Sequence, residues 1–202
     1  MNTLTIIVAV AVVGISDVQG YGSGAPVTAC VGDKLVHTNR TSGERIQPLP
    51  AAENPFRFVA SVTEYIPGEA LTISIEGTDG AQIHGFFLQA RGVDSNISYG
   101  SFTNRFPAKS KVLACQTVND AVTHTDPTAK GSRLVFTWQA PRANTGSIRF
   151  IGSVALNHDE FYTDIESEVI AEGSSAGTVQ MSLAVMTMGV AAALFSLISP
   201  ME

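Results

Sequence analysis

The chain has 202 residues, of which 45% are hydrophobic and 15% charged, and a formal net charge of −6. Acidic residues outnumber basic ones, 18 to 12, and the nearest approach to a basic cluster is Arg105, Lys109 and Lys111, so no nucleic-acid partner is expected. Hydrophobic residues are concentrated at the two ends, and the segment between them has the composition of a soluble domain.

The first hydrophobic run, residues 4–15, has the length of a signal-peptide core and is shorter than the roughly 20 apolar residues that cross a bilayer. Gly20, with Val18 two positions before it, suits signal peptidase. We expect cleavage after Gly20, so that residues 1–20 are a signal peptide and the mature protein is extracellular. An uncleaved anchor is the alternative, because no Lys or Arg precedes the run.

Two cysteines and two sequons fit this secretory route. A secreted context makes a disulfide between Cys30 and Cys115 the default. It would close a loop of about 85 residues, and the chain-entropy model gives such a bridge roughly 4 to 5 kcal/mol. A reactive thiol pair or metal site is the alternative, although no further ligand has matching spacing. The sequons predict N-glycosylation at Asn39 and Asn96.

The first half of the domain shows the period-two alternation of β-strands. Residues 56–63 alternate, with Phe56, Phe58, Ala60 and Val62 on the predicted inner face. A turn at 66–69, with Pro67 and Gly68, leads to a second alternating run at 71–76. Asp79 and Gly80 predict a hairpin tip, after which residues 82–90 form a third strand.

Two more strands follow in the second half. Residues 133–139 alternate, which places Trp138 in the core rather than at a binding surface, and residues 148–156 are apolar on both faces, as in a central strand. Short strands separated by turn signals, without an amphipathic helix, predict an all-β protein with an antiparallel β-sandwich. Phe86 and Phe87 point to opposite faces, so one of them is a candidate for a surface contact.

The C-terminal part divides into an acidic segment and a hydrophobic tail. Residues 21–158 hold 12 basic and 10 acidic residues, whereas residues 159–178 hold six acidic residues and no basic one, which predicts a solvated stalk. Residues 179–202 form the tail, in which no basic residue follows the apolar run 179–198. Small residues, a short spacer and a terminal apolar run are typical of a glycosylphosphatidylinositol signal, with Ser174 as the preferred attachment residue and Gly173 and Ser175 as neighbours. A membrane-spanning tail helix and an unprocessed secreted form are the alternatives.

Several short motifs occur along the domain in a fixed order and spacing: 21–27, 65–69, 85–91, 100–102, 121–124, 138–141 and 146–150. Together they resemble the reeler domain, the module at the N-terminus of reelin and the spondins. It also occurs in ferric-chelate-reductase-like proteins and in small insect defence proteins. The resemblance implies an immunoglobulin-like sandwich over residues 21–158 with a bridge from Cys30 to Cys115.

No catalytic constellation is apparent, and no enzyme activity, cofactor or metal is expected. The four histidines, His37, His84, His124 and His158, lack metal-site spacing, and His84 and His124 are interpreted as structural. A reductase activity does not carry over, because the resemblance implies that haem is held by domains with no counterpart here. Four basic residues could form a weak anionic patch, although solvated loop charges are the favoured interpretation: Arg91, Arg105, Lys109 and Lys111.

Two functions follow as hypotheses. The first is a secreted or lipid-anchored immune protein that contacts microbial surfaces through its loops, by analogy with the stand-alone family members. The second is a matrix or adhesion module that binds glycans or proteins. In either case the ligand is extracellular and unidentified, and the membrane is reached through the lipid anchor or the tail helix.

Overall fold

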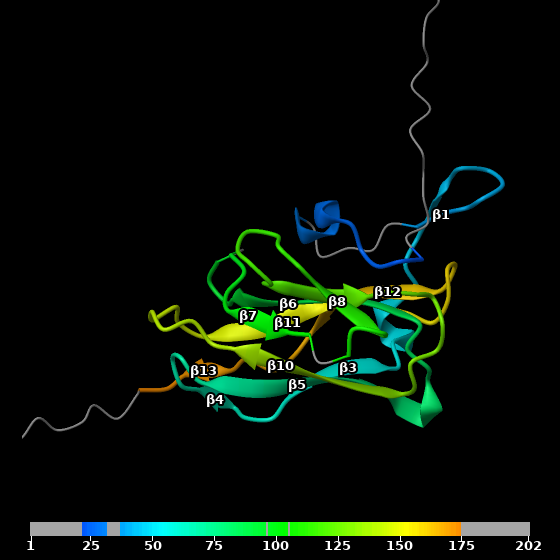
Figure 1. Cartoon of the computed structure of the whole chain (residues 1–202). Helices are drawn as coiled ribbons and strands as arrows, with labels where there is room; N and C mark the ends of the chain where they lie inside the picture. Colours follow the sequence, from blue (N-terminus) through cyan, green and yellow to red (C-terminus); the bar gives the residue numbers. More distant parts are fainter. Residues whose placement is uncertain (1–21, 32–36, 96, 105, 175–202) are drawn as a thin grey trace, which may run out of the picture.

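Two antiparallel β-sheets pack face to face and enclose the main core, as the alternating residues predict (Figure 1). The computed structural model describes residues 22–31, 37–95, 97–104 and 106–174. The four-stranded sheet has the order β3 (Phe56–Ala60), β5 (Ala70–Gly77), β10 (Arg133–Gln139) and β7 (Ser101–Thr103). The five-stranded sheet has the order β12 (Phe161–Glu166), β11 (Ile148–Ala155), β6 (Gly85–Gly92), β9 (Ala121–His124) and β8 (Ser110–Leu113).

Smaller elements complete the described fold. The strands β1 (His37–Thr38) and β2 (Arg45–Ile46) form an antiparallel pair, and β4 (Glu64–Tyr65) pairs in parallel with β13 (Ala171–Glu172). Three short 3₁₀ turns are η1 (Val27–Val31), η2 (Ala51–Glu53) and η3 (Thr78–Gly80). The described residues contain no α-helix, and none of their helical turns is long and apolar enough to span a membrane. The all-β sandwich is therefore confirmed.

Trp138 lies at the centre of the main core, as its alternation with Leu134 and Phe136 predicts. Its ring meets Phe150 and Tyr65 edge to face, with centroids 5.6 and 5.9 Å away. Its indole N–H donates to the carbonyl of Tyr99 at 3.0 Å, so the one polar atom of the side chain is paired within the core.

The predicted turns have different outcomes. The turn at 66–69 is confirmed, since the amide of Glu69 donates to the carbonyl of Ile66 at 3.0 Å and Gly68 has a φ of 82°. The predicted hairpin at Asp79 and Gly80 is wrong, because the strands on either side of it, β5 and β6, belong to different sheets. Asp79 and Gly80 instead have φ values of 51° and 79°, where the chain passes from the four-stranded to the five-stranded sheet. Val62, predicted to face inward, is 41% exposed because β3 ends at Ala60.

The predicted acidic stalk is also wrong over its first part. Residues 161–166 form β12, the edge strand of the five-stranded sheet, and Phe161 is only 1% exposed. Apolar side chains alternate with the acidic ones there, so the carboxylates point to solvent while Tyr162, Ile165 and Ile170 enter the core. The domain therefore continues past residue 158 to β13.

Candidate functional site

A pocket of about 270 Å³ opens at one end of the five-stranded sheet, where β6 and β12 begin and β9 and β11 end. We call it the histidine pocket, because all four histidines of the chain line it: His37, His84, His124 and His158. Arg40 is the one basic residue besides them in the wall, and the other lining residues are small or neutral: Gly22, Gly85, Pro127, Ala155 and Asn157.

Sheet pairing brings the histidines together from distant parts of the sequence. His84 immediately precedes β6 and His124 ends β9, and these two strands are antiparallel neighbours. The amide of His84 also donates to the carbonyl of Ala155 at the end of β11, at 3.0 Å. His158 lies in the following turn, where the Asn157 Oδ1 accepts the amides of two successive residues at 2.8 and 3.0 Å.

His37 reaches the pocket from β1 and packs on the β11–β12 turn. Its ring stacks on His158, with centroids 5.1 Å apart, and it contacts Phe161 with centroids 4.7 Å apart. Its Nδ1 faces the carbonyl oxygen of His158, which can only accept, so Nδ1 carries the hydrogen. Burial lowers the pKa of His37, an effect that the bond to the carbonyl partly opposes, and the ring is therefore neutral near pH 7.

His84 is oriented by a loop that a buried lysine holds in place. The His84 Nδ1 donates to the carbonyl of Pro127 at 3.0 Å. Lys130, which is buried, donates to the carbonyls of His84, Asp126 and Thr128 at 2.7 to 2.8 Å. Burial lowers the pKa of Lys130, and its ion pair with Asp126 opposes this. Lys130 therefore fixes the loop that orients His84.

In the other two histidines, Nδ1 has opposite hydrogen-bonding roles: it donates in His158 and accepts in His124. The Nδ1 of His158 donates to the Asp159 carboxylate at 2.7 Å. In contrast, the Nδ1 of His124 accepts the amide of Phe86 at 3.1 Å, within the wall of the sheet. His124 is buried and hydrogen-bonded, which agrees with its interpretation as a structural residue.

The N-terminal segment 22–31 forms the wall of the pocket at Gly22 and then crosses the outer face of the five-stranded sheet (Figure 1). The amide of Ala25 donates to the Thr123 Oγ1 at 2.9 Å. Gly24 has a φ of 104°, and a Cβ there would lie 2.2 Å from the carbonyl oxygen of His124. Only glycine allows the segment to lie this close to β9.

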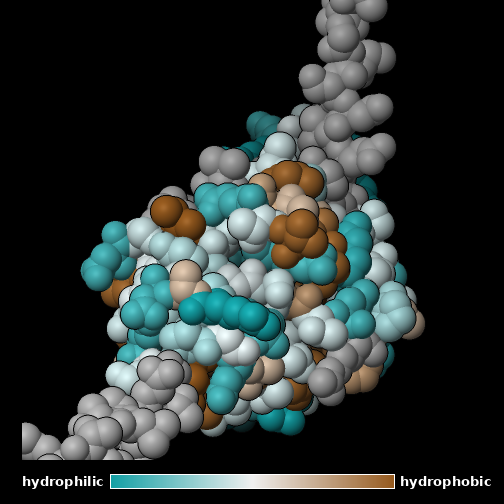
Figure 2. Space-filling view, turned by 60° about the vertical axis from the view of Figure 1, so that its left-hand side comes forward, coloured by the Kyte–Doolittle hydropathy of each residue, from teal (hydrophilic) through white to brown (hydrophobic). Residues whose placement is uncertain are grey.

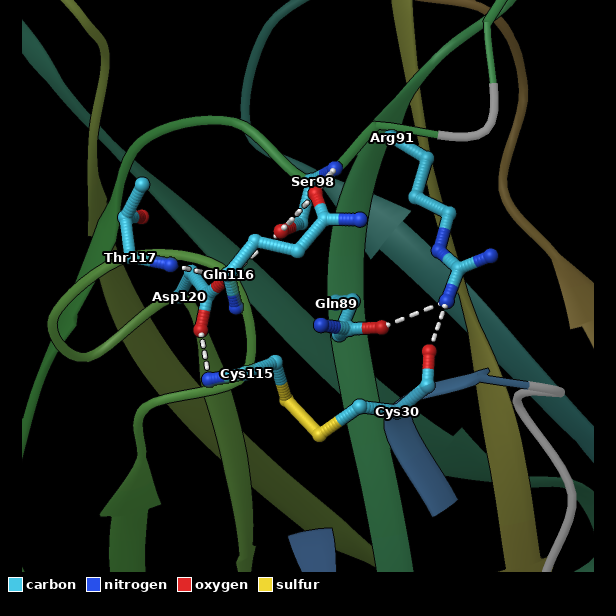
Figure 3. Close-up of a disulfide and its surroundings, with 8 residues drawn as sticks. All are labelled: Cys30, Gln89, Arg91, Ser98, Cys115, Gln116, Thr117 and Asp120. Carbon is cyan, nitrogen blue, oxygen red and sulfur yellow. Dashed lines mark hydrogen bonds between the residues drawn. A yellow bond between two sulfur atoms is a disulfide. The ribbon is translucent and has the colours of Figure 1, made fainter. Parts of the chain in front are cut away.

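The far end of the segment is fixed by the predicted disulfide, because the structure bonds Cys30 to Cys115. Figure 3 shows the surrounding contacts: the guanidinium of Arg91 donates to the carbonyl of Cys30 at 2.6 Å and to the Gln89 Oε1 at 2.8 Å. Arg91 is buried beneath the segment, so it is not the surface charge of an anionic patch.

Asp120 anchors the loop that carries Cys115 (Figure 3). Its carboxylate accepts the Ser98 hydroxyl at 2.5 Å and three backbone amides at 2.7 to 3.0 Å, those of Cys115, Gln116 and Thr117. Burial by itself would raise the pKa of Asp120, but these hydrogen bonds outweigh it and lower that pKa. The ionised carboxylate therefore stabilises the loop at neutral pH.

The predicted surface contact at Phe86 or Phe87 is wrong, because both side chains are 0% exposed. Phe86 lies in the core between the sheets. Phe87 lies on the outer face, under Ala25 and Ala29. Sequence alternation places these rings on opposite faces but gives no sign that both faces are covered.

The remaining predicted sites lie apart from the pocket or outside the described residues. Asn39 is exposed, and Ser174 is exposed at the end of the described chain, beside Gly173. Asn96, Arg105 and Ser175 lie outside the described residues. The cleavage site after Gly20 and the tail at 179–202 do so as well.

Sequence reasoning missed the histidine pocket, because the four histidines have no short spacing in common. The one available signal is position: His84 begins a strand and His124 ends one. Two histidines at opposite ends of their strands meet when those strands pair antiparallel, but the pairing of β6 with β9 cannot be deduced from the sequence alone.

The reeler domain family profile matches residues 29–178. Mouse ferric-chelate reductase 1 is 27% identical to this chain, and the match covers 77% of this chain and 24% of the mouse protein. The cattle protein of the same name is also 27% identical, and the match covers 78% of this chain and 25% of the cattle protein. The chain thus spans about a quarter of these reductases. Hdd11 of Hyphantria cunea, which is named as a defence protein, is 26% identical over 77% of this chain and 90% of its own length.

Solved structures agree in fold. The human F-spondin reeler domain (fragment 1) has 19% identity and a TM-score of 0.51, covering 63% of this chain and 94% of that one. The reelin-N domain of F-spondin has 18% identity and a TM-score of 0.50, covering 63% and 91%.

Removing the disulfide should loosen segment 22–31 and expose Phe87. We expect the double variant Cys30→Ser, Cys115→Ser to lose about 2–5 kcal/mol of unfolding free energy and to bind an apolar dye in its folded state. Denaturation followed by the fluorescence of Trp138 measures the first effect, and reduced wild-type protein is the matched comparison. Unchanged stability together with no dye binding would contradict this role of the bridge.

Replacing Asp120 with Asn should cost about 1.5–3 kcal/mol, because an amide cannot accept from all four donors. Since folding lowers the pKa of Asp120, its contribution is present above its unfolded pKa and is lost as the pH falls through the folded value. Urea denaturation at pH 7 and pH 3 should show a smaller difference between wild type and variant at the lower pH. Asp79→Asn, at an exposed turn position, is the control and should change little.

Proposed function

This chain belongs to the reeler domain family, and from that premise we propose that it is a non-enzymatic binding protein of the cell exterior that acts in innate defence. The observation that carries the proposal is the extent of the match to Hdd11, which covers 90% of that protein. A likeness over nearly the whole of a relative supports a shared role better than one over a quarter of it.

The match to the ferric-chelate reductases supports common ancestry of one domain only. It covers 24% and 25% of the mouse and cattle proteins, so three quarters of each lie outside the comparison. We therefore do not carry the reductase activity over. The proposed role of this chain is to bind a ligand rather than to transfer electrons.

The surface also fits recognition through loops and a pocket. On the face drawn in Figure 2, hydrophobic side chains occur as small separate groups in a largely hydrophilic or neutral surface. Several exposed hydrophobic residues lie in connecting segments, among them Ile97, Phe106 and Val118. Such a surface suits contact with a polar ligand, such as a microbial glycan, better than burial of a broad apolar face.

The binding proposal is tested by mixing the purified mature protein with washed bacteria at physiological salt and sedimenting the cells. We expect the protein to sediment with the bacteria, whereas a β-sandwich protein of similar net charge stays in solution. Depletion of the protein from its host should also slow bacterial clearance. Failure to bind any bacterium, with unchanged clearance, would contradict the defence role.

The alternative role, a matrix or adhesion module, predicts a different result in the same material. Retention on heparin or matrix at physiological salt would support it. We expect little retention, because residues 21–172, which run to the end of β13, hold 12 basic against 16 acidic residues.

We further propose that Ser174 carries a glycosylphosphatidylinositol anchor. Phospholipase C specific for phosphatidylinositol should then release the protein from expressing cells, and mass spectrometry should find the anchor remnant on Ser174. The variant Ser174→Lys, Ser175→Lys should lose surface display, because attachment requires small residues. Resistance to the lipase with retention of residues 179–202 would instead show a tail helix.

A further inference from the structure

In the histidine pocket, His37 and His158 both use Nδ1 as a hydrogen-bond donor. The Nδ1 of His37 donates to the carbonyl of His158, and the Nδ1 of His158 donates to the Asp159 carboxylate. In a neutral imidazole whose Nδ1 bears the hydrogen, Nε2 carries a lone pair. The Nε2 of His158 is buried and has no hydrogen-bond partner among the described residues.

The spacing of the two rings suits one shared ion. Their centroids are 5.1 Å apart. With metal–nitrogen bonds of about 2.0–2.1 Å, two imidazole rings on a tetrahedral ion have centroids about 5 Å apart. The ring planes are inclined by 28° and the Nε2 of His158 is buried, so both rings must rotate before their Nε2 lone pairs converge on one ion in the pocket.

We propose that His37 and His158 bind a divalent transition-metal ion of the zinc class in the histidine pocket. Imidazole is a preferred ligand of such ions, and a ligating histidine usually donates its other N–H to a carbonyl or carboxylate. Both rings have this outer partner, in the carbonyl of His158 and the carboxylate of Asp159. The inference does not depend on the proposed function.

The site would be open, since two imidazoles fill only half of a tetrahedral shell. Among the described residues no group of three His, Cys, Asp or Glu side chains is placed to hold an ion together. The remaining positions therefore go to water or to a donor atom of an external ligand. His84, whose Nδ1 is also bound to a carbonyl, lines the same pocket.

The first test keeps both histidines and removes the carboxylate that accepts the hydrogen bond from the Nδ1 of His158. The full mature protein is titrated with zinc chloride against a chromophoric chelator. Asp159→Asn should weaken zinc binding about tenfold, the usual loss for an outer partner of a ligating histidine. Asp159 is 73% exposed, so the fold should be kept. Glu168→Gln removes the same charge from another exposed position and should have no effect. Equal losses in both variants would show general electrostatic attraction and overturn the proposal.

The second test observes the nitrogens directly. Long-range ¹H–¹⁵N spectra should show His37 and His158 with hydrogen on Nδ1 in the metal-free protein, and zinc should shift the Nε2 signals of these two residues. His158→Gln should weaken binding by more than tenfold while circular dichroism stays unchanged. Absence of zinc binding, or binding that leaves both Nε2 signals unshifted, would overturn the proposal.

Discussion

The outer face of the five-stranded sheet is apolar, and the need to cover it shapes the rest of the molecule. Phe87 and Ala121 on that face would be exposed if the two sheets packed only against each other. Segment 22–31 covers them and is held at Cys30 by the disulfide and by Arg91. A third layer is thus added to a two-layer sandwich by a segment too short to hold its place through apolar contacts alone. The same segment also completes the wall of the histidine pocket.

Buried charge, rather than buried apolar surface, stabilises the ends of this arrangement. Arg91 and Asp120 at the disulfide end, and Lys130 at the pocket end, each bond to backbone carbonyls or amides that the loops leave unpaired. Such bonds satisfy groups that would be costly to bury without partners. They explain how irregular segments can be as well packed as the strands beside them.

The sequence predicted what depends on local pattern. The strands around Phe58, Ile73 and Trp138 follow from period-two alternation, and the bridge follows from a count of two cysteines. It could not predict what depends on strand pairing. His84, His124 and His158 meet because β6, β9 and β11 are neighbours, and His37 joins them from β1. The acidic content of residues 159–166 predicts a stalk, whereas the apolar residues between the charges place residues 161–166 in a strand.

The β4–β13 pair fixes where the described chain ends, because β13 ends two residues before Ser174. β11 begins beside Ile170, close to β13, and ends at Ala155 in the wall of the pocket, and its eight residues span roughly 26 Å at the usual rise of a strand. Ser174 and the histidine pocket therefore lie at opposite poles of the sandwich. Any surface that holds the protein through Ser174 has the imidazoles turned away from it, toward whatever approaches from solution.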